Sequence, residues 1–257
     1  AGSAACAVPG LNAGSYAITA VYSGNSDFLT STSGTLTQTV NKAAATVTFN
    51  AGTLSQPYDG TVKTVATTTN PAGLTVNISF TGTPLYVGSY PVTATINDAN
   101  YQGSASGTLV IDRKLASVTP NPSGKEYGSG ADPALSGTLS GFLPADGVTA
   151  IYSRNAGENV GTYAISALLG PAGVLGNYNI TYNTASFVIA PKSATVTVDA
   201  KTKTLGSPDP TFTGTVSGFL FADLVTASYS RVPGETAGTY AIIATLSPSS
   251  VLVNYNI

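Results

Sequence analysis

Hydrophobic and polar residues alternate with a period of two along much of the chain. Tyr16, Ile18 and Ala20 fall on one face of an extended segment, while Ala17 and Thr19 fall on the other. Because successive side chains of a strand point to opposite faces, this alternation predicts a half-buried β-strand. The same alternation recurs in segments 90–96, 163–169 and 240–246.

Further short segments are rich in the β-branched and aromatic residues that suit a pleated sheet. The clearest alternating pairs are Val47/Phe49, Leu109/Ile111, Phe187/Ile189 and Val196/Val198. No window of 11–18 residues places apolar residues at helical spacing, and 28 Gly and 15 Pro interrupt the chain every few residues. We therefore predict an all-β protein.

One pattern occurs four times, which indicates a tandem array. Each copy contains Gly, then Ser or Thr, then Tyr, and begins a predicted strand. The glycines are Gly14, Gly88, Gly161 and Gly238, and the tyrosines are Tyr16, Tyr90, Tyr163 and Tyr240. An acid or amide followed by an aromatic residue comes after each copy, at Asp27-Phe28, Asn100-Tyr101, Asn177-Tyr178 and Asn254-Tyr255.

The pattern divides the chain into four repeats. Residues 1–41 form the C-terminal part of an incomplete repeat, residues 42–113 and 114–191 form two full repeats, and residues 192–257 form a repeat without its last strand. The third and fourth repeats are closely similar: Asp132, Arg154 and Glu158 recur 77 residues later as Asp209, Arg231 and Glu235. These two repeats therefore arose by duplication.

Short strands at regular spacing, with a Gly-x-Tyr before a late strand, predict a two-sheet Ig-like β-sandwich for each repeat. By analogy with the tyrosine corner of such folds, each Tyr of the pattern would bury its ring and bond a nearby carbonyl through its hydroxyl. The linkers between repeats are only a few residues long, so we expect an extended, semi-rigid rod.

Composition narrows the function. The chain has 10 Lys and Arg against 12 Asp and Glu, so it lacks the basic surface that nucleic-acid binding needs. It has no His and only one Cys, which removes the commonest general base and the usual zinc ligands. No apolar run approaches the ~18–20 residues of a membrane span. We predict no catalytic site, no cofactor, no metal and no membrane span.

The repeats resemble known families. Tyr127-Gly128, Ser140-Gly141-Phe142 and Gly157-Glu158 of the third repeat, and most of their counterparts in the fourth, are similar to MBG-type Ig-like repeats of large bacterial secreted and surface proteins. Tyr58-Asp59-Gly60 in the second repeat resembles the related YDG type. The fourth repeat departs from the pattern with Leu205-Gly206 in place of Tyr127-Gly128. The resemblance implies an extracellular bacterial array used as a stalk, adhesin or filament, and it implies no reaction.

The recurring charged residues have two readings. Asp132, Arg154 and Glu158, like Asp209, Arg231 and Glu235, could be paired carboxylates for glycoside chemistry. Duplication favours a structural reading, with Asp-Pro initiating a turn and Arg154 pairing locally with Glu158. Turn chemistry is likewise favoured over calcium binding in the loops 23–27 and 97–100, and strand packing over sugar stacking at Tyr152 and Tyr229.

These observations lead to a non-enzymatic structural repeat region of a bacterial secreted or cell-surface protein. Its partners would be its own neighbouring repeats, with identical chains in a filament, surface glycans or a host receptor as further partners. The fourth repeat stops before the strand that closes the third, and we favour flanking sequence of a longer repetitive protein as the explanation over the alternative of a self-assembling filament subunit that a neighbour completes by strand addition. Others are a carbohydrate- or receptor-binding module and an accessory region of a secreted enzyme. The role of Cys6 stays open between a buried thiol and an intermolecular disulfide.

Overall fold

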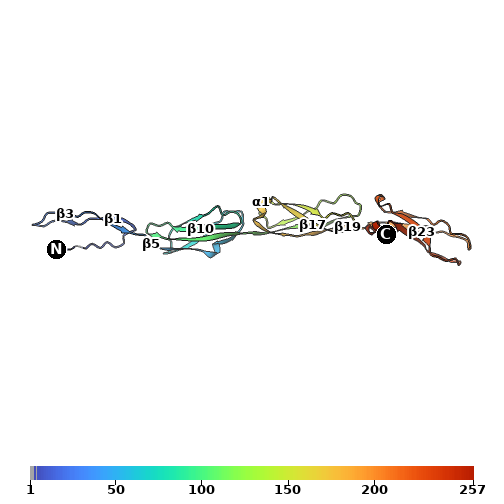
Figure 1. The fold of residues 1–257 in the computed structure, drawn as a ribbon, viewed down its shortest axis with the longest axis horizontal. Coiled ribbons are helices and arrows are strands. Elements are labelled where there is room, and N and C mark those ends of the chain that lie inside the picture. The colour runs from blue at the N-terminus through green and yellow to red at the C-terminus, as the bar shows by residue number, and fades with distance from the viewer. Residues whose placement is uncertain (1–2, 4) are drawn as a thin grey trace. The chain divides into compact units, whose positions relative to one another are not determined.

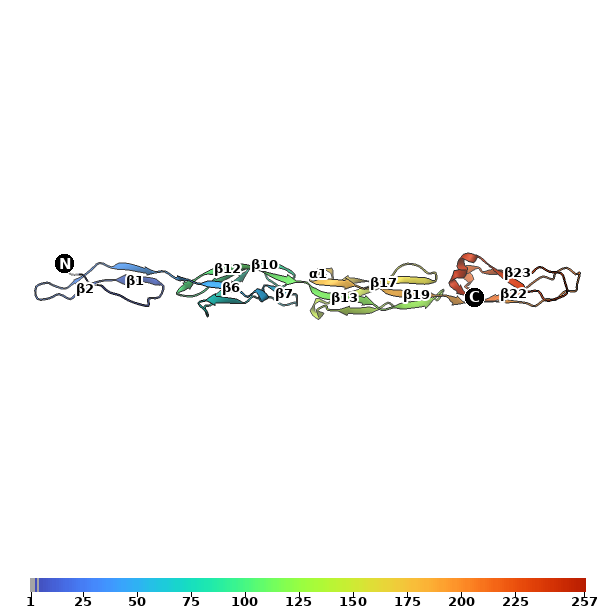
Figure 2. The ribbon, with the colours of Figure 1, turned by 90° about the horizontal axis from the view of Figure 1, so that it is seen from below.

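The computed structural model describes residue 3 and residues 5–257, and this part of the chain consists of strands joined by turns and short helical segments (Figures 1 and 2). Its single α-helix within those residues, α1, is the four-residue segment Ala172–Leu175. The prediction of an all-β protein is confirmed. Among the described residues, no helix has both the length and the apolar character that crossing a bilayer requires.

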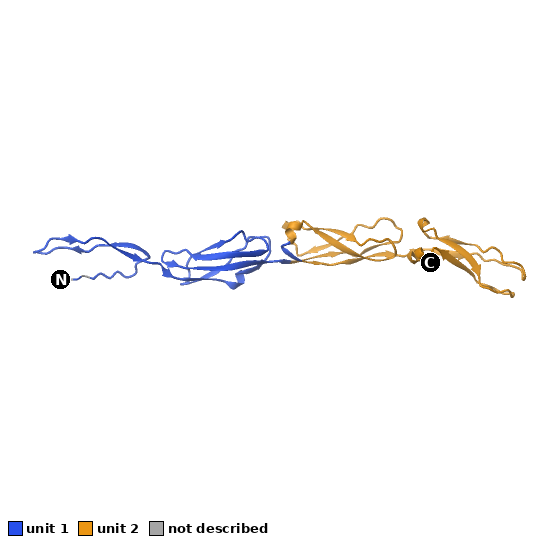
Figure 3. Cartoon of the chain, viewed as in Figure 1, with its two compact units in different colours: residues 1–114, 176–179 blue, residues 115–175, 180–257 orange. Residues whose placement is uncertain are grey.

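The chain divides into two compact units (Figure 3). Unit 1 comprises residues 1–114 together with 176–179, and unit 2 comprises residues 115–175 and 180–257. The short segment 176–179 groups with unit 1 because Asn177 bonds to Val87 and Lys114 of that unit. Each unit therefore contains contacts that join one repeat to the next.

The first repeat in unit 1 is one long, interrupted hairpin. Its strands are β1 (Gly14–Ile18), β2 (Val21–Tyr22), β3 (Ser31–Thr32) and β4 (Leu36–Val40). Strand β1 pairs antiparallel with β4, and β2 pairs antiparallel with β3. Nearly all of these residues are exposed, because a single hairpin has no second layer against which to bury its apolar face.

The second repeat, also in unit 1, has its core between two sheets. Its elements are β5 (Ala43–Ala44), β6 (Thr46–Phe49), the 3-10 turn η1 (Ala51–Thr53), β7 (Ser55–Pro57), β8 (Thr67–Asn70), β9 (Val76–Phe80), β10 (Gly88–Ile96), β11 (Tyr101–Gln102) and β12 (Ser104–Asp112). One sheet has the order β7-β12-β10-β9, and the other pairs β6 with β8. Val47 from β6 packs with Ala94 and Ile96 from β10 between them.

The third repeat has the same plan. Its elements are β13 (Lys114–Pro120), β14 (Ser123–Glu126), β15 (Gly137–Ser140), η2 (Pro144–Asp146), β16 (Thr149–Arg154), β17 (Gly161–Gly170), α1, β18 (Tyr178–Tyr182) and β19 (Ala185–Ala190). The two sheets have the orders β15-β13-β18 and β14-β19-β17-β16. Ile165, Phe187 and Ile189 form its buried core.

The fourth repeat has fewer and shorter strands. Its elements are β20 (Lys192–Ser193), β21 (Thr195–Val198), β22 (Gly214–Ser217), η3 (Phe221–Asp223), β23 (Thr226–Arg231), β24 (Ile242–Ser247), η4 (Ser249–Asn254) and β25 (Tyr255–Asn256). They form the pairs β21-β22, β23-β24 and β20-β25. Tyr240, which the sequence pattern placed on a strand, lies two residues before β24 begins.

Candidate functional site

The four tyrosines of the Gly-x-Tyr pattern make the same type of contact in each repeat. Each hydroxyl donates a hydrogen bond to the carbonyl oxygen four residues earlier. The acceptors are Asn12 for Tyr16 at 2.7 Å, Tyr86 for Tyr90 at 2.8 Å, Asn159 for Tyr163 at 2.7 Å and Thr236 for Tyr240 at 2.9 Å. The bond closes the loop that comes just before Gly14, Gly88, Gly161 and Gly238, and so gives this loop the same form in every repeat.

That loop is where the next repeat attaches. In unit 1, the side-chain oxygen Oδ1 of Asn100 accepts the backbone N–H of Ala13 at 2.9 Å, and Nδ2 of Asn100 donates to Oδ1 of Asn12 at 3.0 Å. The backbone oxygen of Asn100 accepts the N–H of Ala43, at the start of its own repeat, at 2.7 Å. A single asparagine thus joins the loop of the first repeat to the base of the second.

The same asparagine contact occurs at the other two junctions. In unit 1, Oδ1 of Asn177 accepts the N–H of Val87 at 3.1 Å. In unit 2, Oδ1 of Asn254 accepts the N–H of Val160 at 2.9 Å, and Asn254 is 2 % exposed. Because a buried amide that loses its partner costs about 1–3 kcal/mol, the bond at Asn254 favours one arrangement of the two repeats of unit 2.

An aromatic pair accompanies each of the last two asparagine contacts. Tyr58 meets Tyr178 edge to face in unit 1, with ring centroids 5.7 Å apart, and Tyr127 meets Tyr255 in unit 2 at 5.5 Å. Edge-to-face pairs of this kind stabilise by about 0.5–1.5 kcal/mol beyond the area that they bury. Tyr58, Tyr178 and Tyr255 are all buried.

In unit 2 the aromatic pair shares one carboxylate. The Tyr127 hydroxyl lies 3.1 Å from both oxygens of Asp223, and the Tyr255 hydroxyl donates to Oδ2 of the same residue. Burial, followed by the bond to Asp223, raises the pKa of Tyr127, and the same causes raise the pKa of Tyr255 to about 12. Both phenols therefore stay protonated and act as donors at neutral pH.

Gly128, the neighbour of Tyr127, is required at this junction for two reasons. Its φ of +73° belongs to the left-handed region, and a Cβ there would lie 2.3 Å from the Leu220 side chain of the fourth repeat. The equivalent Gly206 would meet nothing within 4 Å, and Leu205 beside it is 69 % exposed. The departure of the fourth repeat from the Tyr-Gly pattern thus falls on a position that has no junction within the described residues.

The charged residues singled out in the third repeat lie together. The Arg154 guanidinium donates to Asp132 at 2.6 and 3.1 Å and to Glu158 at 2.5 Å, and its remaining N–H groups bond the carbonyls of Asn155 at 2.9 Å and Gly157 at 2.6 Å. Lys125 adds contacts to Asp132 at 2.8 Å and Glu158 at 2.6 Å. All the donor positions of Arg154 are therefore used.

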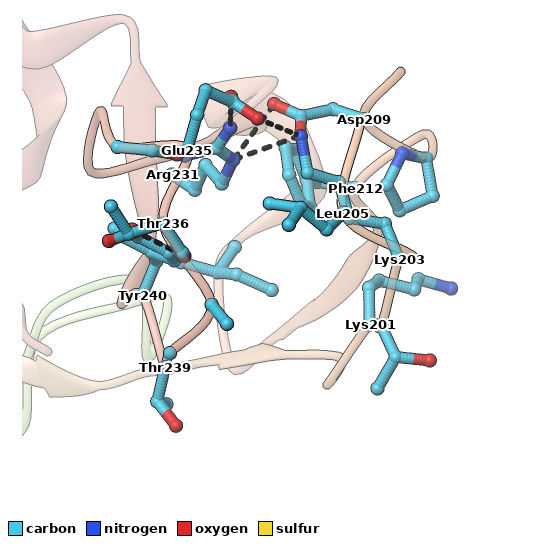
Figure 4. Close-up of a pocket in the computed structure, with 16 residues that line it drawn as sticks. Lys201, Lys203, Leu205, Asp209, Phe212, Arg231, Glu235, Thr236, Thr239 and Tyr240 are labelled. Carbon is cyan, nitrogen blue, oxygen red and sulfur yellow. Dashed lines mark hydrogen bonds and ion pairs between the residues drawn. The ribbon is translucent and has the colours of Figure 1, made fainter. Parts of the chain in front are cut away.

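The fourth repeat repeats this charged cluster. Arg231 pairs with Asp209 at 2.9 Å and with Glu235, while Lys203 lies 2.8 Å from each of the two carboxylates (Figure 4). Sequence analysis found the arginine and the two acids but missed Lys125 and Lys203. Lys125 lies seven residues before Asp132 and Lys203 lies six residues before Asp209, so the lysines depart from the 77-residue spacing that marked the other members of the cluster.

The cations hold the carboxylates in the ionised form. Hydrogen bonds from Arg154 and Lys125 lower the pKa of Asp132 to about 2, and bonds from Lys125 and Arg154 lower the pKa of Glu158. The pKa values of Asp209 and Glu235 are lowered by Lys203 and Arg231 in the same way. Acids held ionised and saturated with cations are suited to fixing a loop, not to donating a proton.

Arg154 also packs on aromatic rings. Its guanidinium carbon lies 4.7 Å from the centre of the Phe187 ring and 5.2 Å from that of Tyr163. Gly157 lies against the Tyr163 ring, because a Cβ at position 157 would be 2.2 Å from that ring. The Gly-Glu dipeptide at positions 157 and 158 thus supplies space for the ring and a partner for the arginine.

The remaining candidates occupy turns and packing positions. Oδ1 of Asn25 accepts the N–H groups of Asp27 and Phe28, and Oδ1 of Asp98 accepts those of Asn100 and Tyr101, so these loop oxygens serve as local caps. Tyr152 lies against Gly137, and Tyr229 lies against Gly214. Cys6 is exposed.

The asparagines at the junctions were visible in the sequence only as part of an Asn-Tyr pattern, without an assigned role. Asn100, Asn177 and Asn254 are 77 residues apart, a strict spacing that could have marked them. Their partners are the backbone N–H groups of Ala13, Val87 and Val160. Because a backbone N–H does not depend on the type of side chain, the sequence pattern does not identify these partners.

Comparison with family models identifies these repeats. A model described as MBG domain matches residues 45–115, and a model described as MBG domain (YGX type) matches residues 116–188 and 194–257. No curated protein matches the chain. The matched segments cover most of the 257 residues, each contains the loop tyrosine and the base asparagine described above, and the chain belongs to the MBG domain family.

Proposed function

We propose that this chain is a non-enzymatic structural region of a bacterial surface protein, in which the repeats form a stalk that holds other parts of the protein away from the cell. The MBG domain family supports a repeat region of a bacterial surface protein. An extracellular location, Ig-like sandwiches and the stalk role are part of the proposal.

The observation that carries the proposal is the asparagine contact that recurs at three junctions. Flexible tethers between domains leave their ends free, whereas here Asn100, Asn177 and Asn254 each bond an amide of the preceding repeat. Such bonds restrict rotation about the short linkers. A stalk requires this property, because a freely jointed chain of small domains does not hold a fixed reach.

The charged clusters support a role in stability, not turnover. The same cluster occurs in the third and fourth repeats, its cations and carboxylates bond one another in both, and the pKa of each of these carboxylates is lowered where an acid catalyst needs a raised one. Tyr152 and Tyr229, the candidates for sugar stacking, pack on glycines of their own repeats.

The stalk role is tested by measuring how firmly unit 2 holds its two repeats. Nitroxide labels at Ser153→Cys and Ser230→Cys, equivalent exposed positions in the third and fourth repeats, are introduced in a Cys6→Ser background. We expect one narrow distribution of label distances by pulsed electron paramagnetic resonance, and a broader one after Asn254→Ala. A broad distribution in the unsubstituted junction would contradict a stiff stalk.

The location is tested separately. Antibodies raised against the 257-residue chain should label intact cells of the source organism. Labelling seen only after the cells are broken open would contradict a surface location while leaving the measurements on the junction unaffected.

A further inference from the structure

The outer face of the third repeat carries an exposed apolar pair. Ile151 on β16 lies directly opposite Leu168 on β17, and these two residues are 70 % and 72 % exposed. The neighbours of Ile151 along β16 on the same face, Thr149 and Ser153, are uncharged and exposed. The pair is therefore apolar surface that the third repeat does not cover by its own folding.

The second and fourth repeats carry polar residues at the equivalent positions. Ser228 lies opposite Thr245 in the fourth repeat, and Asn77 lies opposite Thr95 in the second. These four side chains are exposed, as Ile151 and Leu168 are. The fold of a repeat therefore does not require apolar residues at these two positions, and the pair in the third repeat calls for another explanation.

Strand β16 is also the edge of its sheet. It comes last in the order β14-β19-β17-β16, so one of its sides has no partner strand among the described residues. The N–H of Asn155 bonds the carbonyl of Ala164, which continues the ladder between β16 and β17 by one residue. Because the backbone groups of an antiparallel strand point alternately to its two sides, those of Ala150 and Tyr152 point away from β17. These N–H and C=O groups can pair with a further strand.

The sequence of β16 is complementary to itself at this edge. Two antiparallel copies related by a two-fold axis at Ile151 place Ala150 of each copy opposite Tyr152 of the other, so the outward N–H and C=O groups of both strands bond one another. The two Ile151 residues then face each other at a position without hydrogen bonds, where Cα atoms are only about 4.5 Å apart. The side chains form one apolar row across the two sheets, from Leu168 through both isoleucines to Leu168 of the second copy.

We propose that the third repeat binds the third repeat of a second copy of this chain, with the two β16 strands paired edge to edge and antiparallel about Ile151. The occupant is a second copy because β16 itself supplies both the isoleucine that faces Ile151 and the leucine one strand further on. Burial of the apolar row stabilises the pair, and no like charges meet, since Thr149 lies opposite Ser153. The fourth repeat, with Ser228 at this position, lacks the apolar row.

The first test is sedimentation of the whole 257-residue chain with Cys6→Ser, which excludes disulfides through the exposed thiol. We expect a reversible dimer whose fraction rises with concentration. Ile151→Ser combined with Leu168→Thr introduces the polar residue types of the fourth repeat and should raise the dissociation constant about tenfold or more. Leu115→Thr is the control: this residue of β13 is 74 % exposed but lies on the other sheet, so the dissociation constant should stay unchanged.

Three results of this test would overturn the proposal. The chain could remain monomeric up to millimolar concentration, the double variant could dimerise as tightly as the parent, or Leu115→Thr could weaken the dimer as much as the double variant does. Denaturant unfolding of each variant shows whether the third repeat still folds. We expect that it does, because the fourth repeat forms the same strand pair with Ser228 and Thr245.

Disulfide trapping tests the register and leaves the apolar pair intact. In the Cys6→Ser background, chains with Thr149→Cys are mixed with chains with Ser153→Cys, because these two positions lie opposite each other across the two-fold axis. Mild oxidation of the mixture should give a linked dimer. Either variant alone should give far less, since identical positions are then four residues apart along the strand, about 13 Å. No linked dimer in the mixture, or equal amounts from the single variants, would overturn the proposal.

Discussion

The third and fourth repeats have nearly the same sequence pattern but differ in how much of the pattern becomes ordered strand. Strand β17 runs for ten residues from Gly161, whereas its counterpart β24 runs for six and begins four residues later in register, at Ile242. The difference coincides with β19, the partner of β17 over those first residues. Strand formation in this fold therefore depends on a neighbour as well as on local sequence.

The two repeats also show which contacts do not depend on that neighbour. The charged cluster and the tyrosine-to-carbonyl bond form in both repeats with closely similar distances. The tyrosine bond joins residues four positions apart, whereas the charged cluster joins segments 22 to 33 residues apart within one repeat. The comparison separates a local scaffold, which each repeat builds alone, from a core that requires the closing strand.

The most damaging change should be Phe187→Ala, which removes the fully buried ring from the core of the third repeat. Loss of a fully buried Phe costs about 3–5 kcal/mol in other proteins, and we expect a similar loss in the free energy of unfolding of the third repeat. Urea unfolding followed by circular dichroism measures it. Val188→Ala on the outer face is the control and should change stability by about 0.5 kcal/mol or less.

Asn254→Ala should weaken the junction in unit 2 by about 1–3 kcal/mol, because it leaves the N–H of Val160 without its acceptor. Faster hydrogen exchange of the Val160 amide would report the loss. Asn256→Ala, an exposed side chain two residues away, should have no such effect, and equal acceleration in both variants would show that the asparagine side chain is not the joining element.

Gly157→Ala should destabilise the third repeat more than Gly234→Ala destabilises the fourth. In both places a Cβ would lie within 2.2 Å of a tyrosine ring, and overpacking of this kind costs about 1–3 kcal/mol. Tyr163 lies opposite Phe187 of β19, whereas Tyr240 lines an open groove in the fourth repeat and has room to move. Equal losses in the free energy of unfolding of the two variants, measured by denaturant unfolding, would contradict the expectation that the Tyr240 ring has room to move.

Tyr127→Phe should cost about 1 kcal/mol, because it removes one hydrogen bond to Asp223 but keeps the ring contact with Tyr255. The matched change in the fourth repeat is Leu205→Tyr, at a position that is 69 % exposed and should leave stability unchanged. Thermal unfolding measures both. A loss at Leu205→Tyr as large as that at Tyr127→Phe would remove the distinction between the two positions.

The smallest effect should be the response of the charged clusters to acid. The pKa of Asp132 is about 2 in the folded chain against an ordinary value of 3.8, so its contribution is complete above about pH 4 and is lost as the pH falls toward 2. Asp209, with its lowered pKa, changes in the same direction. Exposed ion pairs contribute little, so the decline in melting temperature should be modest, and Asp132→Asn should flatten it.

Much of the fold could be predicted from sequence because its determinants are local. Alternation of Tyr163 with Ile165 marks a strand whatever lies around it, and a Gly-x-Tyr recurring four times marks the repeats. The pairing of Arg154 with Glu158, four residues away, could also be anticipated from spacing. Lys125 joins the same cluster from a separate strand, and sequence analysis did not include it.

Sequence by itself thus determined the all-β class, the order of the repeats and the tyrosines that close their loops, because these depend on residues near one another in the chain. Only the tertiary structure showed that Asn254 bonds Val160 and that Tyr127 meets Tyr255 and Asp223, about a hundred residues away. It also showed that Tyr240 lies outside β24, whereas Tyr163 belongs to β17 and lies opposite Phe187 of β19. The physical reason is that backbone amides are nearly the same at every residue, so the sequence pattern does not show which side chain or strand will bond them. The partners meet only when the folded repeats bring distant parts of the chain together.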